Sequence, residues 1–160
     1  MATHSKPTAE EVGTLAAEAK TAKARIATDK GDIVFAFYPD VAPLHCAAYI
    51  KLARAGYYDG TIFHRVEPGF VVQGGDPTGT GMGGRDYNLE AEFSNQPHIQ
   101  GTVAMARSSN PNSAGSQFYI CLDDAPFLNK NYTVFGQVVE GQSVVDAIRV
   151  GDVMNKVTIE

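Results

Sequence analysis

The sequence has no long apolar run, no cluster of basic residues and only two cysteines. A transmembrane helix needs about 18 or more consecutive apolar residues, and no stretch of this chain approaches that length. The first residues, Met1 to Lys6, also lack the basic-then-apolar order of a secretory signal. We therefore expect a soluble cytoplasmic protein with no membrane partner.

Basic residues are scattered along the chain, and the formal net charge is −5 at pH 7. Binding to nucleic-acid phosphates favours a basic face, so we expect no nucleic-acid partner. Hydrophobic residues make up 44% of the chain and charged residues 19%, a balance typical of globular proteins. A chain of 160 residues is long enough to bury a core within one domain, which we expect to be monomeric.

Three features that can carry chemistry have simpler structural interpretations here. Cys46 and Cys121 lie in apolar segments without a neighbouring base, so we expect buried, reduced thiols. No pair of histidines has metal-ligand spacing, so we expect no metal. The segment from Gly79 to Gly84 matches G-x-G-x-x-G, but no helix pattern follows it. We interpret it as a tight loop whose glycines supply positive φ angles.

The first 23 residues differ from the remainder, being rich in Ala, Glu, Thr and Lys. The order Thr8-Ala9-Glu10-Glu11 matches a capping box and predicts a helix over about 9–23. Gly13 and the thin apolar stripe weaken a free-standing helix. We therefore divide the chain into an N-terminal extension (1–23), either a docked helix or a disordered arm, and one domain (24–160).

Strand patterns dominate after residue 24, so the fold class is mainly β. Period-two alternation predicts a hairpin over 26–38 and further strands over 61–72, 87–93, 102–106, 117–121, 133–139 and 157–159. Helical periodicity predicts helices over about 43–56 and 143–149. This pattern favours a closed antiparallel barrel with helices over its open ends, because closure removes exposed strand edges.

One cation stands inside the apolar, aromatic-rich run from Phe63 to Asp76. An arginine in a half-buried strand must be paired or used, since burying an unmatched charge is costly. Gln73 adds amide donors and an acceptor nearby. Arg65 and Gln73 together suit a pocket that holds an uncharged, partly apolar ligand at a carbonyl group. The structural alternative is that Arg65 pairs with a carboxylate such as Glu67 or Asp76.

Two separated motifs resemble those of the cyclophilins, a family of peptidyl-prolyl isomerases. The first comprises Phe63-His64-Arg65, Pro68-Gly69-Phe70 and Gln73-Gly74-Gly75-Asp76, and the second runs from Met105-Ala106-Arg107 to Gly115-Ser116-Gln117-Phe118. The resemblance extends from about Ala24 to the end and is greatest to the bacterial branch. It implies a closed eight-stranded antiparallel β-barrel capped by two α-helices, with the active site on its outer wall.

The resemblance further implies an isomerase of X–Pro bonds that assists protein folding, binds proline-containing peptides and unfolded proteins, and needs no cofactor. It assigns catalytic roles to Arg65, Gln73 and Gln117. It assigns substrate binding to Phe70, Val71, Ala106, Arg107, Tyr119, Phe127, Leu128 and Tyr132. In an extended strand, Gln117 and Tyr119 face the site while Phe118 and Ile120 face the core. The competing function is a non-catalytic proline-peptide binding module or chaperone that uses the same groove.

Several positions depart from the best-known eukaryotic pattern of the family. Phe127 stands where tryptophan is usual, and phenylalanine has no N–H donor. We therefore expect only weak binding of cyclosporin A. Arg107 stands in place of asparagine and Tyr119 in place of phenylalanine. We interpret His64 as a hydrogen-bonded core histidine without a catalytic role, because isomerisation transfers no proton.

Overall fold

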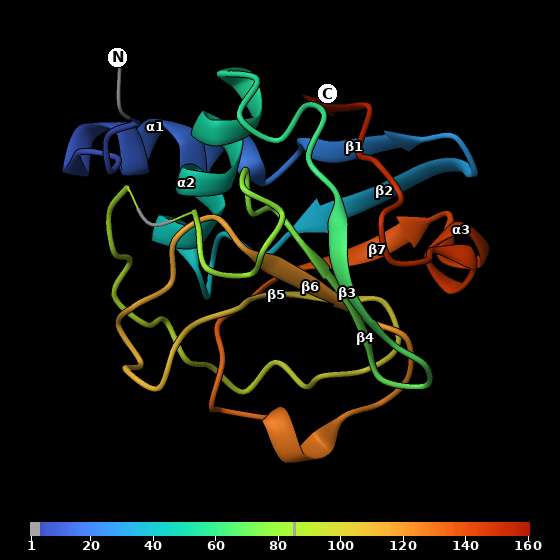
Figure 1. The fold of residues 1–160 in the computed structure, drawn as a ribbon. Coiled ribbons are helices and arrows are strands. Elements are labelled where there is room, and N and C mark those ends of the chain that lie inside the picture. Colours follow the sequence, from blue (N-terminus) through green and yellow to red (C-terminus); the bar gives the residue numbers. More distant parts are fainter. Residues whose placement is uncertain (1–3, 85) are drawn as a thin grey trace.

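The structure, a computed structural model, describes residues 4–84 and 86–160, so the first three residues of the predicted extension lie outside it. An antiparallel eight-stranded sheet is its frame, in the order β3-β4-β6-β5-β7-β2-β1-β8 (Figure 1). The strands are β1 (Lys23–Thr28), β2 (Gly31–Phe37), β3 (Phe63–Glu67), β4 (Val71–Gly74), β5 (Thr102–Met105), β6 (Phe118–Cys121), β7 (Val134–Glu140) and β8 (Lys156–Ile159).

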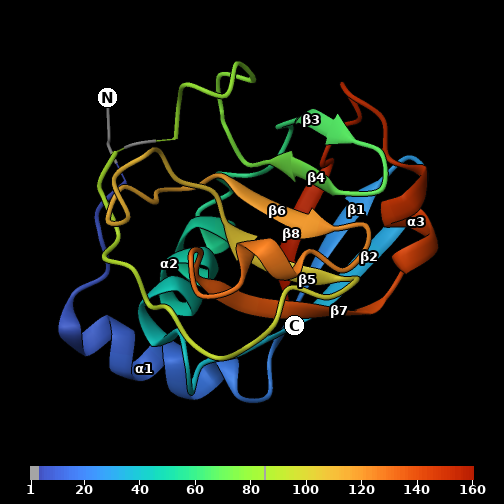
Figure 2. The same cartoon turned by 90° about the horizontal axis from the view of Figure 1, so that it is seen from below.

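The predicted closure of the barrel is wrong in detail, because the sheet curls strongly but stays open (Figure 2). The strands β3 and β8 form its two edges, and no ladder joins them. The segments that precede these strands meet in a single bridge, Ile62 to Val153, and the Phe63 N–H donates to the Asp152 carbonyl at 2.9 Å. Backbone hydrogen bonds thus join residues 60–63 to residues 151–154, but among the described residues none joins β3 to β8 itself, so the seam between the two edges is only partly closed.

Two helices lie at opposite ends of the curled sheet, as expected (Figures 1 and 2). They are α2 (Pro43–Arg54) and α3 (Gln142–Ala147), and a short 3-10 helix η1 (Pro126–Leu128) lies in a loop. Helix α2 begins at a proline, which suits a first helical turn. It inserts the fully buried Tyr49 into an aromatic core, stacked on Tyr58 at 4.8 Å. None of the helices in the described residues is both long and apolar enough to span a bilayer.

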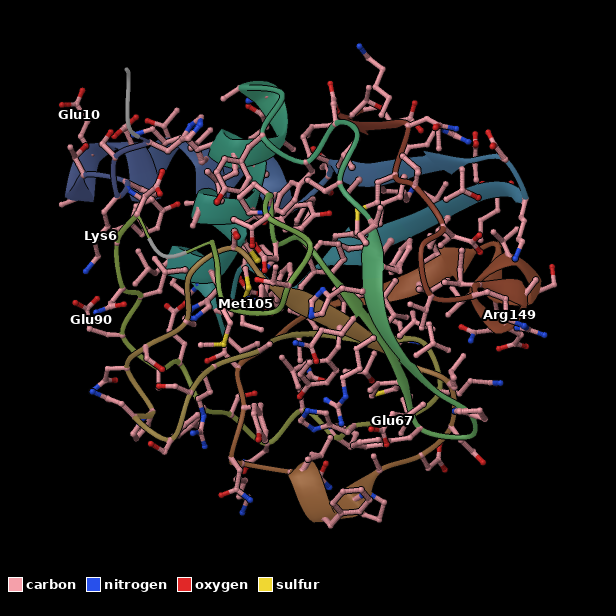
Figure 3. All side chains as sticks on the ribbon, viewed as in Figure 1. Lys6, Glu10, Glu67, Glu90, Met105 and Arg149 are labelled. Atoms are coloured by element: carbon pink, nitrogen blue, oxygen red, sulfur yellow. The ribbon has the colours of Figure 1, made fainter. Side chains whose placement is uncertain are left out.

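The N-terminal segment forms a docked helix, α1 (Ala9–Ala19), four residues shorter than the predicted end at Lys23. The capping box between Thr8 and Glu11 is present. Helix α1 lies beside α2 (Figure 1), and ion pairs join Glu11 to Lys51 and Glu18 to Arg54. The preceding residues are attached as well, since Lys6 pairs with Glu90 at 2.5 Å (Figure 3).

The strand predicted over 87–93 is absent, and only an isolated bridge from Leu89 to Ala114 marks it. The Glu92 carboxylate instead accepts the backbone N–H groups of Leu44 (3.1 Å) and His45 (2.9 Å). These are free donors in the first turn of α2, where a carboxylate is favoured. The segment is therefore held by side-chain bonds to a helix terminus rather than by a neighbouring strand.

Candidate functional site

The alternation of side chains along β4 and β6 separates the interior of the sheet from its outer wall. Phe118 and Ile120 pack in the main core, whereas Tyr119 belongs to a second apolar cluster with Val71 and Leu128. The predicted alternation along this strand is confirmed. Because Tyr119 is nearly buried, at 5% exposure, it forms a wall of the outer cluster and not a free surface group.

Nine of the eleven predicted site residues line one cavity of about 140 Å³, which we call the apolar pocket. They are Arg65, Phe70, Val71, Gln73, Ala106, Arg107, Tyr119, Leu128 and Tyr132. Gln117 lines an adjoining cavity of about 90 Å³, the polar pocket, which shares Gln73, Ala106 and Arg107 with the first. Phe127 lies outside both, 68% exposed on η1, with its ring 5.5 Å from Phe70.

Arg65 combines both interpretations made from the sequence, because it is paired and also lines the pocket. Its side chain is 44% exposed, so the strand is less buried at this position than expected. The guanidinium donates to Glu67 Oε1 through Nε (3.2 Å) and Nη2 (3.0 Å), and to Gln73 Oε1 through Nη1 (3.1 Å). Asp76, the other carboxylate considered as a partner, serves a different purpose.

A chain of side-chain amides continues from this arginine into the polar pocket. Gln73 Nε2 donates to Gln117 Oε1 at 3.1 Å. Gln117 Nε2 then donates to the carbonyl oxygens of Gly81 and Gly83, both at 2.9 Å. Because a carbonyl oxygen only accepts, these two bonds decide which end of the Gln117 amide faces Gln73. The Gln117 amide in turn orients the Gln73 amide, whose oxygen accepts a hydrogen bond from Arg65.

Asp76 holds the loop that supplies these two carbonyls. Its fully buried carboxylate accepts backbone N–H bonds from Thr78 (2.8 Å), Thr80 (3.2 Å), Gly81 (2.6 Å) and Gly83 (3.0 Å). Desolvation by burial opposes the charged form, but these donors outweigh it and lower the pKa of Asp76 to about 2. A Cβ at Gly83 would collide with the Asp76 carboxylate, so the loop needs glycine there.

A buried polar group lies behind the wall of the apolar pocket. His98 Nε2 is 2.8 Å from the Tyr119 hydroxyl, and the two rings stack at 5.9 Å. Asn129 Oδ1 accepts the His98 backbone N–H (2.7 Å) and lies 3.2 Å from Nδ1. Burial lowers the pKa of His98, and the bond to Asn129 opposes this shift only in part. Neutral His98 therefore accepts a hydrogen bond from the Tyr119 hydroxyl, and this bond fixes the orientation of the Tyr119 ring.

Arg107 stands between the two pockets and is held by neutral partners. Its Nε (3.0 Å) and Nη2 (2.7 Å) donate to the Asn131 carbonyl, and its Nη1 donates to the Ser108 carbonyl at 2.9 Å. The guanidinium lies over the Tyr132 ring, 4.6 Å from its centroid. These contacts hold the cation in place at the rim without neutralising it.

The structure also tests the interpretations of His64 and of the two cysteines. The interpretation of His64 as a hydrogen-bonded core residue is wrong, because it is only partly buried and its Nδ1 has no partner. Burial lowers the pKa of His64. Both cysteines are free and buried as expected, and burial raises the pKa of Cys121 to about 12. Among the described residues no cluster of potential ligands could hold a metal ion.

Sequence reasoning missed the residues that support the site from behind. His98 and Asn129 carry no motif, because their role depends on a contact with Tyr119 across 21 positions of the chain. The carbonyls of Gly81 and Gly83 are backbone groups, which a residue pattern does not reveal. Asp76 carried a usable signal, since an acidic residue directly before a glycine-rich loop is suited to accept its N–H groups.

Comparisons with known proteins all point to one family. The family model described as cyclophilin type peptidyl-prolyl cis-trans isomerase/CLD matches residues 23–160. A probable peptidyl-prolyl cis-trans isomerase of Brucella abortus is 50% identical over 133 residues, covering 76% of this chain and 68% of the relative. A peptidyl-prolyl cis-trans isomerase of Synechococcus elongatus is 44% identical over 132 residues, covering 81% of this chain and 90% of the relative.

A solved structure extends the likeness to the fold. The cyclophilin type peptidyl-prolyl cis-trans isomerase of Cryptosporidium parvum, crystallised in the presence of the dipeptide Ala-Pro, matches with a TM-score of 0.81. The two sequences are 32% identical, and the match covers 86% of this chain and 98% of the Cryptosporidium chain.

Proposed function

The chain belongs to the cyclophilin-type peptidyl-prolyl cis–trans isomerases, and on that premise we propose that Arg65 accelerates rotation about X–Pro bonds by stabilising the twisted amide. The observation that supports the proposal is the position of this arginine. It lines a pocket with apolar walls and is oriented by Glu67 and Gln73. The isomerase activity itself follows from the family, and the role of Arg65 is the part that we propose.

The chemistry requires no covalent step. Resonance between the amide nitrogen and its carbonyl opposes rotation with a barrier of about 18–20 kcal/mol, and uncatalysed X–Pro exchange takes tens of seconds or longer. At the twisted geometry this resonance is lost, so the nitrogen lone pair becomes an acceptor. A donor placed against that nitrogen stabilises the transition state while leaving the planar ground state almost unaffected, which is the condition for catalysis.

Arg65 has the donors for this purpose. Three of the five guanidinium N–H groups are used, two toward Glu67 and one toward Gln73, which leaves two for a substrate. One charge-assisted hydrogen bond contributes about 1.5–3 kcal/mol. An acceleration of roughly 10⁵-fold requires about 7 kcal/mol, so desolvation and orientation of the substrate must supply the larger share.

The remaining residues of the site have two tasks: some hold the proline ring of the substrate, and others hold its peptide backbone. We place the proline ring against Phe70, Val71, Tyr119 and Leu128, consistent with the Ala-Pro dipeptide present with the Cryptosporidium relative. Gln73 would hold the carbonyl of the residue before proline, so that one side of the bond turns while the other stays fixed. We infer that the partners of the protein are proline-containing peptides and unfolded proteins. We further infer that it acts as a monomer and needs no cofactor.

The experiment is proline-limited refolding of a test protein, with the parent protein and with Arg65→Ala. We expect the variant to lose most of the acceleration while still binding an Ala-Pro peptide in a chemical-shift titration. Arg65→Lys keeps the charge but loses the planar fork and should recover only part of it. The matched control is Arg25→Ala, since Arg25 is likewise paired with carboxylates but does not line either pocket.

Two outcomes would redirect the proposal. Full activity in Arg65→Ala would remove this arginine from the mechanism. Peptide binding without turnover in the parent would instead favour the non-catalytic binding module or chaperone.

A further inference from the structure

Arg107 carries a positive charge that the fold positions but does not pair. Of the ion pairs in the described part of the chain, none involves this residue, so no carboxylate lies within 4.0 Å of its guanidinium. Its hydrogen-bond partners, Asn131 and Ser108, offer only neutral carbonyl oxygens. The other arginine of the site, Arg65, differs because Glu67 neutralises it.

The geometry leaves Arg107 able to bind an anion. Three of its five N–H donors are used by carbonyl groups, and two are left. The contact with the Tyr132 ring and the three bonds hold the guanidinium in one orientation, which reduces the entropy lost when a ligand binds. A planar guanidinium is well suited to bind carboxylates, and bonds of this kind are stronger than neutral ones.

The location of Arg107 between the pockets decides which part of a substrate meets it. With proline in the apolar pocket and the preceding carbonyl on Gln73, the chain passes over the residues that both pockets share. The residue two positions before proline then reaches the polar pocket. The lining of that pocket among the described residues is glycine, serine, alanine, amides and Arg107, with no acidic side chain.

One carboxylate behind this lining, that of Asp76, opposes an acidic ligand. It is fully buried and accepts four backbone N–H groups of the 78–83 loop, so donors surround its charge. The charge of Arg107 is partly exposed and lies directly on the rim. The nearer and less shielded cation therefore dominates the field that a ligand in the polar pocket experiences.

We propose that Arg107 makes this enzyme prefer substrates with Asp or Glu two residues before the proline. The inference rests on the proposed placement of proline in the apolar pocket. A partly exposed pair with a carboxylate corresponds to about a three- to tenfold gain in kcat/KM. The gain arises mainly through KM, because the pair forms equally in the planar and the twisted state.

The test uses three peptides, Xaa-Ala-Pro-Phe with Xaa as Glu, Gln or Lys, and measures exchange between isomers by NMR. We expect the parent protein to turn over the Glu peptide about three- to tenfold faster than the Gln peptide and the Lys peptide more slowly than both. The ratio of Glu to Gln should fall as salt is added. In Arg107→Gln it should fall to about one, and in Arg107→Lys it should be intermediate.

Arg149→Gln is the matched control, because this arginine also donates to a carbonyl group but lines neither pocket. It should keep the ratio of the parent. A ratio near one in the parent, or an unchanged ratio in Arg107→Gln, would overturn the inference.

If no peptide is turned over, the proposed mechanism fails rather than the preference. Chemical-shift titrations with the same three peptides then still decide whether the Glu peptide binds more tightly than the Gln peptide.

Discussion

The side-chain amide of Gln73 donates to the side-chain oxygen of Gln117 across 3.1 Å, and this bond links the two pockets of the site. Gln117 gives both of its own N–H groups to loop carbonyls, so neither amide can rotate by half a turn without losing bonds. Gln73 Oε1 is thereby directed at Arg65. The orientation of Arg65, the proposed catalytic residue, therefore depends through Gln73 and Gln117 on backbone carbonyl groups of the glycine-rich loop.

Gln117→Glu should destabilise the protein at neutral pH. The new carboxylate would face the carbonyl oxygens of Gly81 and Gly83 without a proton to donate, in a site where Gln117 is only 9% exposed. Both Gln117→Glu and Gln117→Ala leave these acceptors unsatisfied, at a cost of about 1–3 kcal/mol, but only the carboxylate also brings a negative charge against the two carbonyl oxygens. Urea unfolding at pH 7 should show this loss, and lowering the pH should recover part of it by protonating the new side chain. Gln117→Ala is the control, and equal stability of the two variants would contradict the argument.

Asp76→Asn should lower stability in a pH-dependent way. The pKa of Asp76 is about 2 in the folded protein, against about 3.9 in an unfolded chain. Because the folded pKa is depressed, the stabilisation is fully present above about pH 4 and is lost as the pH falls through about 2. It amounts to about 2–3 kcal/mol. Urea unfolding at pH 6, 4 and 3 should show parent and variant converging toward acid, and a constant difference would refute the assignment.

Removal of residues 1–21 should lower the thermal midpoint by a few degrees and leave peptide turnover intact. Helix α1 packs on α2 through ion pairs and the buried Ala19, and none of its residues lines either pocket. Exposed ion pairs are individually weak, so most of the effect should come from lost packing. Differential scanning calorimetry and the refolding assay measure the two quantities. A large loss of turnover would show that the extension supports the site.

Cyclosporin A should bind weakly, and Phe127→Trp should tighten its binding by about tenfold. Phe127 is largely exposed beside the apolar pocket and has no N–H to donate. One neutral hydrogen bond contributes about 0.5–1.5 kcal/mol, and the upper end of this range corresponds to the tenfold gain expected from an indole donor. Titration calorimetry with the parent, Phe127→Trp and Phe127→Leu separates the donor from the change in apolar area. Tight binding by the parent would count against this expectation.

The sequence by itself determined the local elements and the chemical identity of the site. The capping box before α1, the proline at the start of α2 and the alternation through Tyr119 are local, because each depends on residues a few positions apart. The two motifs likewise contain Arg65, Gln73 and Gln117, the residues to which the resemblance gave catalytic roles and which line the pockets.

Only the tertiary structure decided how those groups are oriented. The open seam of the sheet, the carboxylate of Glu92 at the start of α2 and the contact of His98 with Tyr119 join residues far apart in the chain. No local pattern encodes such approaches, since they depend on how the whole sheet curls. The same reason explains why the sequence indicated that Arg65 would be paired or used, whereas the fold showed that Glu67 pairs it and that Arg107 has no carboxylate partner among the described residues.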